Sequence, residues 1–313
     1  MPYHVGGAKT AVPEKLGVGA SMSAFVIHGK EFTASSLEAG LYVVATPIGN
    51  LGDITIRALE TLAACGVIAC EDTRVTGKLL SRYAIDTARR PYHEHNADRE
   101  GPKLIELLRQ GQAVALVSDA GTPLISDPGQ RLVAAARDEG FPVIAIPGAS
   151  APLTALAASG FSTARFTFAG FLPPKAGARQ AALAAFAESH GTLVFFEGPS
   201  RLAATLSDMA EVFGADHRAC VARELTKLHE EFRSGPLGEL AAHYREHQVK
   251  GEIVILVEPL AGAAEADRET VLRELLETMN VSRAAAEAAR LTGLPKRELY
   301  QLALQISEKA REE

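Results

Sequence analysis

The fold of this chain is decided at residues 40–66, GLYVVATPIGNLGDITIRALETLAACG. The stretch begins with GLYVVAT, a short apolar run with β-branched side chains that is typical of a buried strand. PIGNLGD follows and combines proline, glycine and asparagine, as turns do. ITIRALETLAACG then has apolar residues at helical spacing and ends at a glycine. The stretch therefore predicts one strand, loop and helix of an α/β domain.

The same unit recurs as far as residue 155. Strands are predicted at VIAC (67–70), AVALVSD (113–119) and PVIAIPG (142–148), and helices at VTGKLLSRY (75–83), GPKLIELLRQG (101–111) and QRLVAAARDEG (130–140). Short apolar strands that alternate with helices indicate a parallel sheet covered on both faces. We therefore expect a parallel-sheet α/β domain over residues 39–155. Ser126, Asp127 and Pro128 are predicted to cap the helix that follows them.

A second α/β domain is expected over residues 156–260. Its strand candidates are RFTFAGFL (165–172), GTLVFFEG (191–198), RACVARELT (218–226), EEFRSGPL (230–237) and GEIVILVEP (251–259). Fewer helices separate these strands than in the first domain. This spacing favours a mixed sheet.

The two ends of the chain have a different character. Residues 1–38 lack sustained periodicity, and we interpret them as an extension that is disordered or partly not native. LAGAAEADRE (260–269) is expected to be a linker to a helical domain at 261–313. In that domain Ser282 is predicted as an N-cap, with a break at Gly293 and a new helix at Pro295. The pattern fits a helix-turn-helix or a helical hairpin docked on the body equally well.

Composition excludes several classes of protein. The chain has 313 residues, 47% of them hydrophobic, and a formal net charge of −6, which argues against a surface that wraps nucleic acid as a whole. No apolar run is long enough for a membrane helix, and the N-terminus lacks the order of a signal peptide, so a cytoplasmic protein without membrane contact is expected. Cys65, Cys70 and Cys220 lie in apolar surroundings and are expected to pack as small hydrophobic residues.

Three predicted strands of the first domain end in loops of small residues: ATPIGNLGD (45–53), SDAGTP (118–123) and PGASA (147–151). In an open parallel sheet the carboxyl ends of the strands form the ligand-binding edge, so the loops predict a binding site there. Neither the dinucleotide-binding nor the P-loop glycine motif follows the first strand. A ligand without a pyrophosphate is therefore favoured.

Eight segments, in this order, resemble the ribosomal RNA small subunit methyltransferase I family of the tetrapyrrole-methylase superfamily. They are LYVVATPIGNLGDITIRALETLAACGVIACEDTRVTGKLL (41–80), YHEHN (92–96), VALVSDAGTPLISDPG (114–129), VIAIPGASA (143–151), FAGFLP (168–173), FFEGPSRL (195–202), ARELTKLHEEFRSG (222–235) and GEIVILVE (251–258). The resemblance implies S-adenosylmethionine as cofactor and 2′-O-methylation of a cytidine ribose in 16S ribosomal RNA, near the decoding centre of the small subunit. It also implies two α/β domains with the cofactor between them, and a homodimer.

The resemblance also implies which residues bind the cofactor. They belong to three loops of the first domain and to strand ends of the second: Pro47, Ser118, Asp119, Ala120, Gly121, Thr122, Ser150, Ala151, Phe196, Ala222, Arg223, Gly251 and Glu252.

Charged residues near the same edge are candidates for catalysis and RNA binding. A ribose hydroxyl needs a base to accept its proton, and Glu71, Asp72, Asp119 and His93 are left unranked for this role. The predicted RNA-binding residues are Arg74, Arg82, Arg89, His93, Lys296 and Arg297. A purely structural alternative makes Asp72 or Thr73 a helix cap with Arg74 exposed. The cluster of His93, Glu94 and His95 is not expected to bind a metal, because adjacent residues do not generally face one centre.

Three other functions remain open from the sequence. A tetrapyrrole C-methylase would share the fold, but it would need neither the helical tail nor EDTR (71–74). A nicotinamide dehydrogenase is disfavoured by the missing glycine fingerprint. A non-catalytic RNA-binding or assembly factor would not bind S-adenosylmethionine.

Overall fold

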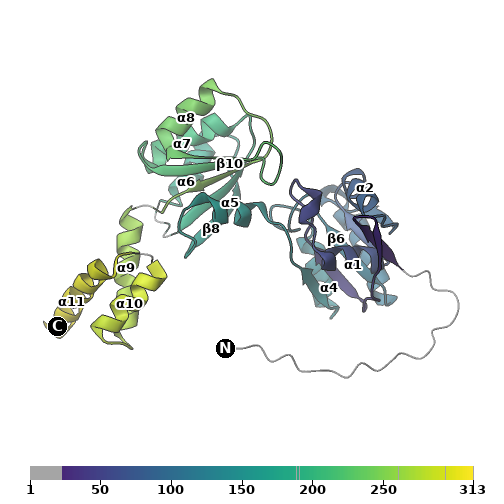
Figure 1. The fold of residues 1–313 in the computed structure, drawn as a ribbon, viewed down its shortest axis with the longest axis horizontal. Coiled ribbons are helices and arrows are strands. Elements are labelled where there is room, and N and C mark those ends of the chain that lie inside the picture. Colours follow the sequence, from purple (N-terminus) through teal and green to yellow (C-terminus); the bar gives the residue numbers. More distant parts are fainter. Residues whose placement is uncertain (1–22, 188, 190, 260, 293, 313) are drawn as a thin grey trace.

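The computed structural model describes residues 23–187, 189, 191–259, 261–292 and 294–312. Two five-stranded sheets with their helices form the body, and three helices at the C-terminal end form a lobe of their own (Figure 1). None of the helices in these ranges is both long and apolar enough to cross a membrane.

The first sheet is parallel throughout. Its strands are β3 (Gly40–Val44), β4 (Val67–Cys70), β5 (Arg89–Pro91), β6 (Ala113–Val117) and β7 (Val143–Ile146), in the spatial order β5-β4-β6-β3-β7. The helices are α1 (Ile56–Ala64), α2 (Thr73–Arg82), α3 (Ala97–Arg109) and α4 (Gln130–Asp138), with short 3₁₀ turns at Leu51–Asp53 and Glu94–Asn96. The parallel sheet predicted for this part of the chain is confirmed.

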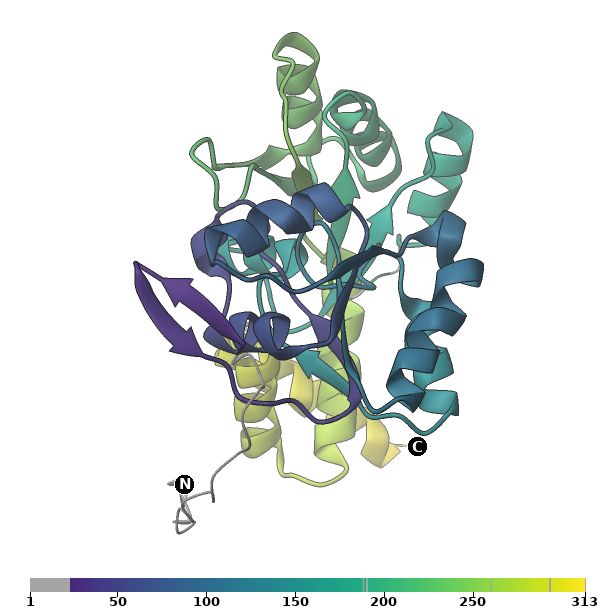
Figure 2. The same ribbon diagram turned by 90° about the vertical axis from the view of Figure 1, so that its right-hand side faces the viewer.

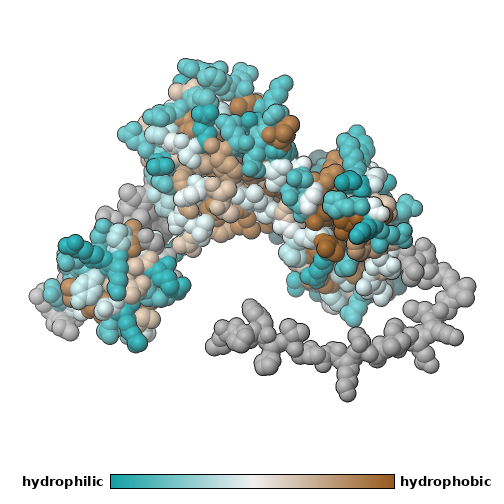
Figure 3. Space-filling view, viewed as in Figure 1, coloured by the Kyte–Doolittle hydropathy of each residue, from teal (hydrophilic) through white to brown (hydrophobic). Residues whose placement is uncertain are grey.

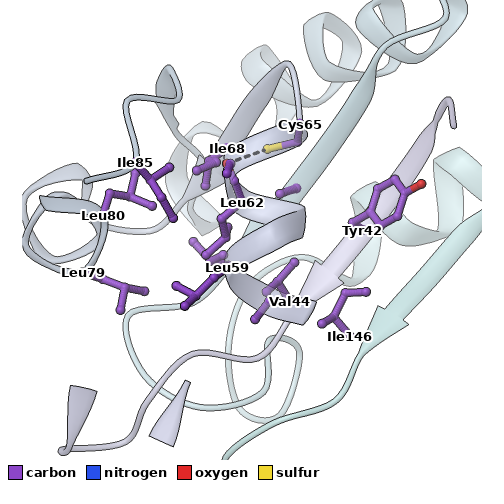
Figure 4. Packing of buried hydrophobic residues seen from close by; sticks show 14 of the residues in the cluster. Tyr42, Val44, Leu59, Leu62, Cys65, Ile68, Leu79, Leu80, Ile85 and Ile146 are labelled. Carbon is purple, nitrogen blue, oxygen red and sulfur yellow. Dashed lines mark hydrogen bonds between the residues drawn. The ribbon is translucent and has the colours of Figure 1, made fainter. Parts of the chain in front are cut away.

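The strands of this sheet are buried on both faces because successive side chains point to opposite sides. Tyr42 and Val44 of β3 pack with α1 and α2 on one face, as Figure 4 shows. Leu41 of β3 packs with α3 and α4 on the other face, where Leu116 of β6 joins it. Helices α2 and α4 therefore cover opposite faces of the sheet.

Part of the N-terminal extension is ordered, contrary to our expectation for residues 1–38. β1 (Ala24–Ile27) and β2 (Lys30–Thr33) form an antiparallel hairpin, which projects beside the first sheet in Figure 2. Phe25 anchors it, since this side chain is buried in the core under α1, and the Val26 N–H donates to the Tyr83 carbonyl at 2.7 Å. A four-residue strand held by one buried aromatic residue is too short to give a periodicity signal. Residues 1–22 lie outside the described part of the chain.

The second sheet is mixed, as predicted. Its strands are β8 (Phe166–Phe171), β9 (Thr192–Glu197), β10 (Arg218–Arg223), β11 (Glu231–Pro236) and β12 (Ile253–Val257), in the order β11-β10-β12-β9-β8. Only the β8–β9 pair among these is parallel. Helices α6 (Ala176–Ala184), α7 (Leu202–Phe213) and α8 (Leu237–Glu246) share a core with one face of the sheet.

The other face of the second sheet turns toward the first domain. Helix α5 (Ala151–Ser159) packs there together with Ile48 from the loop after β3. The domain boundary that the sequence suggested, at residue 155, thus lies inside α5. The chain thus passes from the first sheet to the second through α5, a helix of nine residues.

The C-terminal lobe contains α9 (Ala261–Leu276), α10 (Val281–Thr292) and α11 (Lys296–Glu312), which pack around a separate core that includes Leu272, Ala285 and Leu299. The expected linker at 260–269 is wrong from Ala261 onward, because these residues form the first turns of α9; the Ala- and Glu-rich composition is helix-forming. The predicted N-cap of α10 is also wrong: the Asn280 side chain, not that of Ser282, accepts from the Arg283 N–H at 3.0 Å. Gly293 lies outside the described residues, and α11 begins after Pro295 as predicted.

The three cysteines are buried and unpaired, as expected from their apolar surroundings. Burial raises the pKa of the Cys65 thiol to about 12.

Candidate active site

The three small-residue loops of the first domain meet at the carboxyl edge of the parallel sheet. Thr46, just after β3, and Gly121, after β6, exchange two backbone hydrogen bonds of 2.9 and 3.0 Å. The Thr122 hydroxyl donates to the Ala149 carbonyl after β7 at 3.2 Å. The expectation that these loops share one edge is confirmed, and their mutual hydrogen bonds make that edge a single structure.

A cavity of about 330 Å³ lies where this edge faces the second sheet. Its volume is in the range of small-molecule sites, and apolar side chains with a few polar groups line it, as such sites require. The lining residues are Ile48, Ala120, Gly121, Thr122, Ile125, Ser126, Asp127, Ser150, Ala151, Pro152, Phe171, Phe196, Glu197, Gly198, Pro199, Leu225, Gly251, Glu252, Ile253 and Val254.

Most of the residues that the resemblance assigned to the cofactor line this cavity. They are Ala120, Gly121, Thr122, Ser150, Ala151, Phe196, Gly251 and Glu252. Gly251 shows why a glycine is needed: its φ is +99°, and a Cβ would lie 2.3 Å from a Glu224 carboxylate oxygen. The loop can turn into the cavity here because no side chain is present.

Five of the assigned residues lie outside the cavity lining. Ser118 is buried, and its hydroxyl donates to the carbonyls of Ala120 and Gly121 at 3.3 and 3.4 Å. These bonds stabilise the loop after β6 from the side away from the cavity. Pro47 and Ala222 are buried beneath the surface. The two others bind partners outside the cavity lining: Arg223 forms an ion pair with Glu231 at 3.0 Å, and the Asp119 carboxylate accepts from the Asp72 backbone N–H at 3.0 Å.

The prediction that Ser126 and Asp127 cap the next helix is wrong. Helix α4 begins at Gln130, and its N-cap is Gly129 at φ +133°, with no side-chain hydrogen bond. A Cβ on Gly129 would lie 2.8 Å from Leu116, so close packing of this turn on β6 sets the start of the helix. The chain thereby carries Asp127 into the cavity instead.

Four carboxylates gather at the ends of β4 and β6: Glu71, Asp72, Asp119 and Asp127. Asp72 is the N-cap of α2, since its Oδ1 accepts from the Arg74 N–H at 2.8 Å, and its carboxylate also binds the Arg74 guanidinium at 2.6 Å. These hydrogen bonds lower the pKa of Asp72 to about 2. The cap interpretation of Asp72 is therefore confirmed, and a carboxylate this acidic is a poor proton acceptor.

Glu71 has the opposite electrostatic setting. Burial raises the pKa of this half-buried carboxyl, and the negative charges of Asp119, Asp127 and Asp72 raise it further. Burial likewise raises the pKa of Asp127, while a hydrogen bond from Ser118 lowers it in part. A carboxylate with a raised pKa holds a proton more strongly, so Glu71 and Asp127 are better bases than Asp72.

Comparison with known proteins agrees with this geometry. Residues 40–241 match the family described as tetrapyrrole (corrin/porphyrin) methylases, and residues 262–307 match the RsmI C-terminal HTH domain. A ribosomal RNA small subunit methyltransferase I from Mesorhizobium japonicum is 53% identical over 281 residues, which cover 89% of this chain and 96% of that protein. One from Synechocystis is 47% identical, over 85% of this chain and 98% of its own length.

The chain belongs to the ribosomal RNA small subunit methyltransferase I family. The family match to an HTH domain, together with the separate core of α9–α11, favours the helix-turn-helix over the docked hairpin. The fold extends to more distant proteins: a uroporphyrin-III C-methyltransferase from Thermus thermophilus, complexed with S-adenosylhomocysteine, has a TM-score of 0.52 at 18% identity and covers 70% of this chain and 97% of its own.

The RNA-binding candidates of this family member lie in three places. Arg74 and Arg82 are exposed on α2, and the Arg89 guanidinium lies across that helix and donates to the Thr73 carbonyl at 3.1 Å. His93 is half-buried, and its backbone N–H donates to the Asn96 side chain at 2.9 Å. Lys296 and Arg297 are exposed in the first turn of α11. Within the described ranges, no group of three His, Cys, Asp or Glu residues is arranged to hold a metal ion.

Sequence reasoning missed several residues of the cavity. The buried Glu197 is held by the Thr205 hydroxyl at 2.5 Å and by the Arg201 guanidinium at 3.1 Å, and so fixes the loop that contains Gly198 and Pro199. The dipeptide Gly198-Pro199 directly after a strand is the sequence signal that could have identified this side of the cavity, which the second domain contributes. Asp127 had no such signal, because its loop could equally begin a helix.

Proposed function

We propose that this protein transfers the methyl group of S-adenosylmethionine to the 2′-oxygen of a cytidine ribose in 16S ribosomal RNA, near the decoding centre of the small subunit. Membership of the family supports the reaction class and the ribosomal substrate. The observation that carries the proposal is the cavity of small-molecule size, which Asp127 lines. The charge of Asp127 also acts on Glu71, so the carboxylate cluster lies next to this cavity. Ribosomal subunits as substrate imply action in the cytoplasm.

The residues of the cavity fit the cofactor. Small residues, Gly121 and Ala151 among them, allow close approach, Phe196 and Val254 offer apolar surface to an adenine, and Thr122 and Glu252 offer hydrogen-bonding groups. S-adenosylmethionine, when bound, supplies the electrophilic methyl group. The protein holds the ribose oxygen in line with the methyl group and accepts the proton of the ribose hydroxyl. We assign the role of proton acceptor to Glu71.

A direct test compares two substrates. Radioactive S-adenosylmethionine, incubated with small subunits that lack the modification, should yield labelled RNA, whereas a porphyrinogen should remain unlabelled. A tetrapyrrole C-methylase would give the reverse result. An assembly factor without catalysis would label neither substrate.

The C-terminal lobe is expected to contribute phosphate contacts. Charge reversal at Lys296 and Arg297 should weaken binding to small subunits and reduce the slope of log affinity against log salt by about 2, because each cation at a phosphate contributes about 1. Binding titrations at four salt concentrations measure this slope. An unchanged slope would reject the placement of these residues on RNA.

We further propose that the protein is a homodimer through β8 and α5. β8 is an edge strand, its Phe166 is 43% exposed, and Leu153 of α5 is 52% exposed. Figure 3 shows apolar side chains gathered on the surface around these elements. Exposed apolar patches of this kind are typical of protein interfaces.

The dimer is tested by the double variant Leu153→Asp, Phe166→Asp. We expect half the native molar mass in light scattering after size exclusion, because two charges would be buried in the interface. Leu304→Asp in α11, also at an exposed leucine, is the matched control and should keep the native mass. A double variant that keeps the native mass would place the interface elsewhere.

A further inference from the structure

A second and larger cavity, of about 1030 Å³, lies beside the candidate active site. The N-terminal hairpin forms one wall, the loop after β3 and the start of α1 form the floor, and the end of α2 and the loop after β10 close the other sides. The lining residues are Val26, Ile27, His28, Gly49, Asn50, Leu51, Gly52, Ile54, Ile56, Leu59, Arg82, Tyr83, Thr226, Lys227 and Leu228. The reaction proposed above makes no use of this cavity.

Two touching loops separate it from the cofactor cavity. Ile48 and Leu225 line the cofactor cavity, whereas the next residues along each loop, Gly49 and Thr226, line the larger one. A Cβ on Gly49 would lie 2.5 Å from a Lys227 side-chain carbon and 2.9 Å from the Leu225 carbonyl oxygen, so the loops are in direct contact. The two cavities are therefore adjacent, and only these two loops would separate a ligand in one from a ligand in the other.

The larger cavity has an apolar floor that nothing in the described chain covers. Ile56 on the floor is 62% exposed, and Leu228 on the side formed by the loop after β10 is 93% exposed. Such exposure of large apolar side chains at a concave surface indicates a binding site. Nucleobases pack their flat faces against apolar as well as aromatic side chains, so they match a surface of this kind.

A basic stripe on α2 connects the two sites. Arg74, Lys78 and Arg82 are exposed and four residues apart, so they lie on one face of the helix over about 12 Å. Arg74 binds Asp72 at the carboxylate cluster, and Arg82 lines the larger cavity. Neither Lys78 nor Arg82 has a carboxylate within ion-pair distance in the described residues, whereas Lys227 already binds Glu224 and Glu252. Phosphate-binding charge is thus available along α2.

We propose that this cavity binds one or two nucleotides of single-stranded RNA that flank the methylated nucleotide, with their phosphates on Lys78 and Arg82. The proposal rests on the RNA methylation proposed above. Lys78 and Arg82 have no carboxylate partner among the described residues, and they lie between the carboxylate cluster and the exposed apolar side chains of the cavity. This arrangement suits an RNA strand better than a protein segment, because both phosphates and bases find a partner. The N-terminal hairpin then has a function, as the outer wall of a nucleotide site.

Kinetics on small subunits test the charges. Lys78→Ala with Arg82→Ala should raise KM for subunits by about tenfold or more at physiological salt, with an unchanged Kd for S-adenosylmethionine. The control is Arg137→Ala on α4, an exposed arginine on the opposite face of the sheet, which should leave KM unchanged. A native KM in the double variant would overturn the proposal, while the native enzyme would still methylate RNA.

Crosslinking tests the occupant. A photoreactive phenylalanine analogue in place of Leu228 should crosslink to 16S RNA within about three nucleotides of the methylated one. A crosslink to a ribosomal protein, or to RNA elsewhere, would overturn the proposal even if methylation is native. Absence of methylation by the unmodified enzyme would instead remove the proposed function and this inference with it.

Discussion

Glu71→Gln is expected to lower the rate constant of methyl transfer by about 10²- to 10⁴-fold, the usual contribution of a general base. The carboxyl is half-buried beside three other carboxylates, and both burial and their charges raise its pKa. Glutamine keeps the size of the side chain but cannot accept the proton. The measurement is a single-turnover rate on small subunits, with saturating cofactor, so that cofactor binding and product release do not mask the chemical step.

The control is Asp72→Asn, an isosteric change in the adjacent residue. Asparagine can also cap α2, so this variant should lose only the ion pair with Arg74 and keep most of the rate constant. The pH dependence gives a second readout: a base must be unprotonated, so the rate should rise with pH through the raised pKa of Glu71 and then level off. Glu71→Gln should remove that rise. A near-native rate in Glu71→Gln, with a strong loss in Asp72→Asn, would reject the assignment of the base.

Gly198→Phe is expected to abolish binding of S-adenosylmethionine, with a Kd at least ~100-fold higher, which corresponds to about 3 kcal/mol of lost binding. Gly198 lines the cavity to which we assign the cofactor, and a Cβ placed on it meets no atom within 4 Å. The first atom of a new side chain therefore fits without a clash, and we expect the phenyl ring to fill part of this cavity of about 330 Å³. Isothermal titration calorimetry on the folded variant measures the effect.

The matched control is Gly177→Phe on α6. A Cβ there also meets no atom within 4 Å, and the residue is exposed outside the cavity lining. Both variants should unfold near the native temperature, which separates a blocked site from a damaged fold. If Gly198→Phe bound the cofactor with native affinity, the cavity between the two sheets would not be the cofactor site.

Much of the first domain could be predicted from sequence because its signals are local. Runs such as AVALV (113–117) are buried on both faces, and the loops that follow them carry the small residues of the sheet edge. Since parallel strands place their carboxyl ends together, the meeting of these loops at one edge could be predicted from the strand pattern. The pairing of Thr46 with Gly121 depends in addition on the order of the strands in the sheet.

The remaining features depend on contacts between distant segments. The sequence around Asp127 predicts a helix cap. In the structure, Gly129 packs on Leu116 and α4 begins only at Gln130, so Asp127 does not cap it. The ranking of Glu71 above Asp72 requires the partners of each carboxylate, which the sequence does not name. The hairpin at 24–33 depends on one side chain, Phe25, which packs in a core with residues of α1. This helix begins more than thirty residues later in the sequence.

The central claim, ribose methylation of small-subunit RNA by this protein, is tested most directly by mass mapping of nucleosides. Small subunits from cells that lack the protein are incubated with the purified enzyme and S-adenosylmethionine, and their RNA is digested and analysed. We expect a single gain of 2′-O-methylcytidine within 16S RNA, absent without enzyme and strongly reduced with Glu71→Gln. A methyl group on a base, or RNA without any gain under these conditions, would contradict the account.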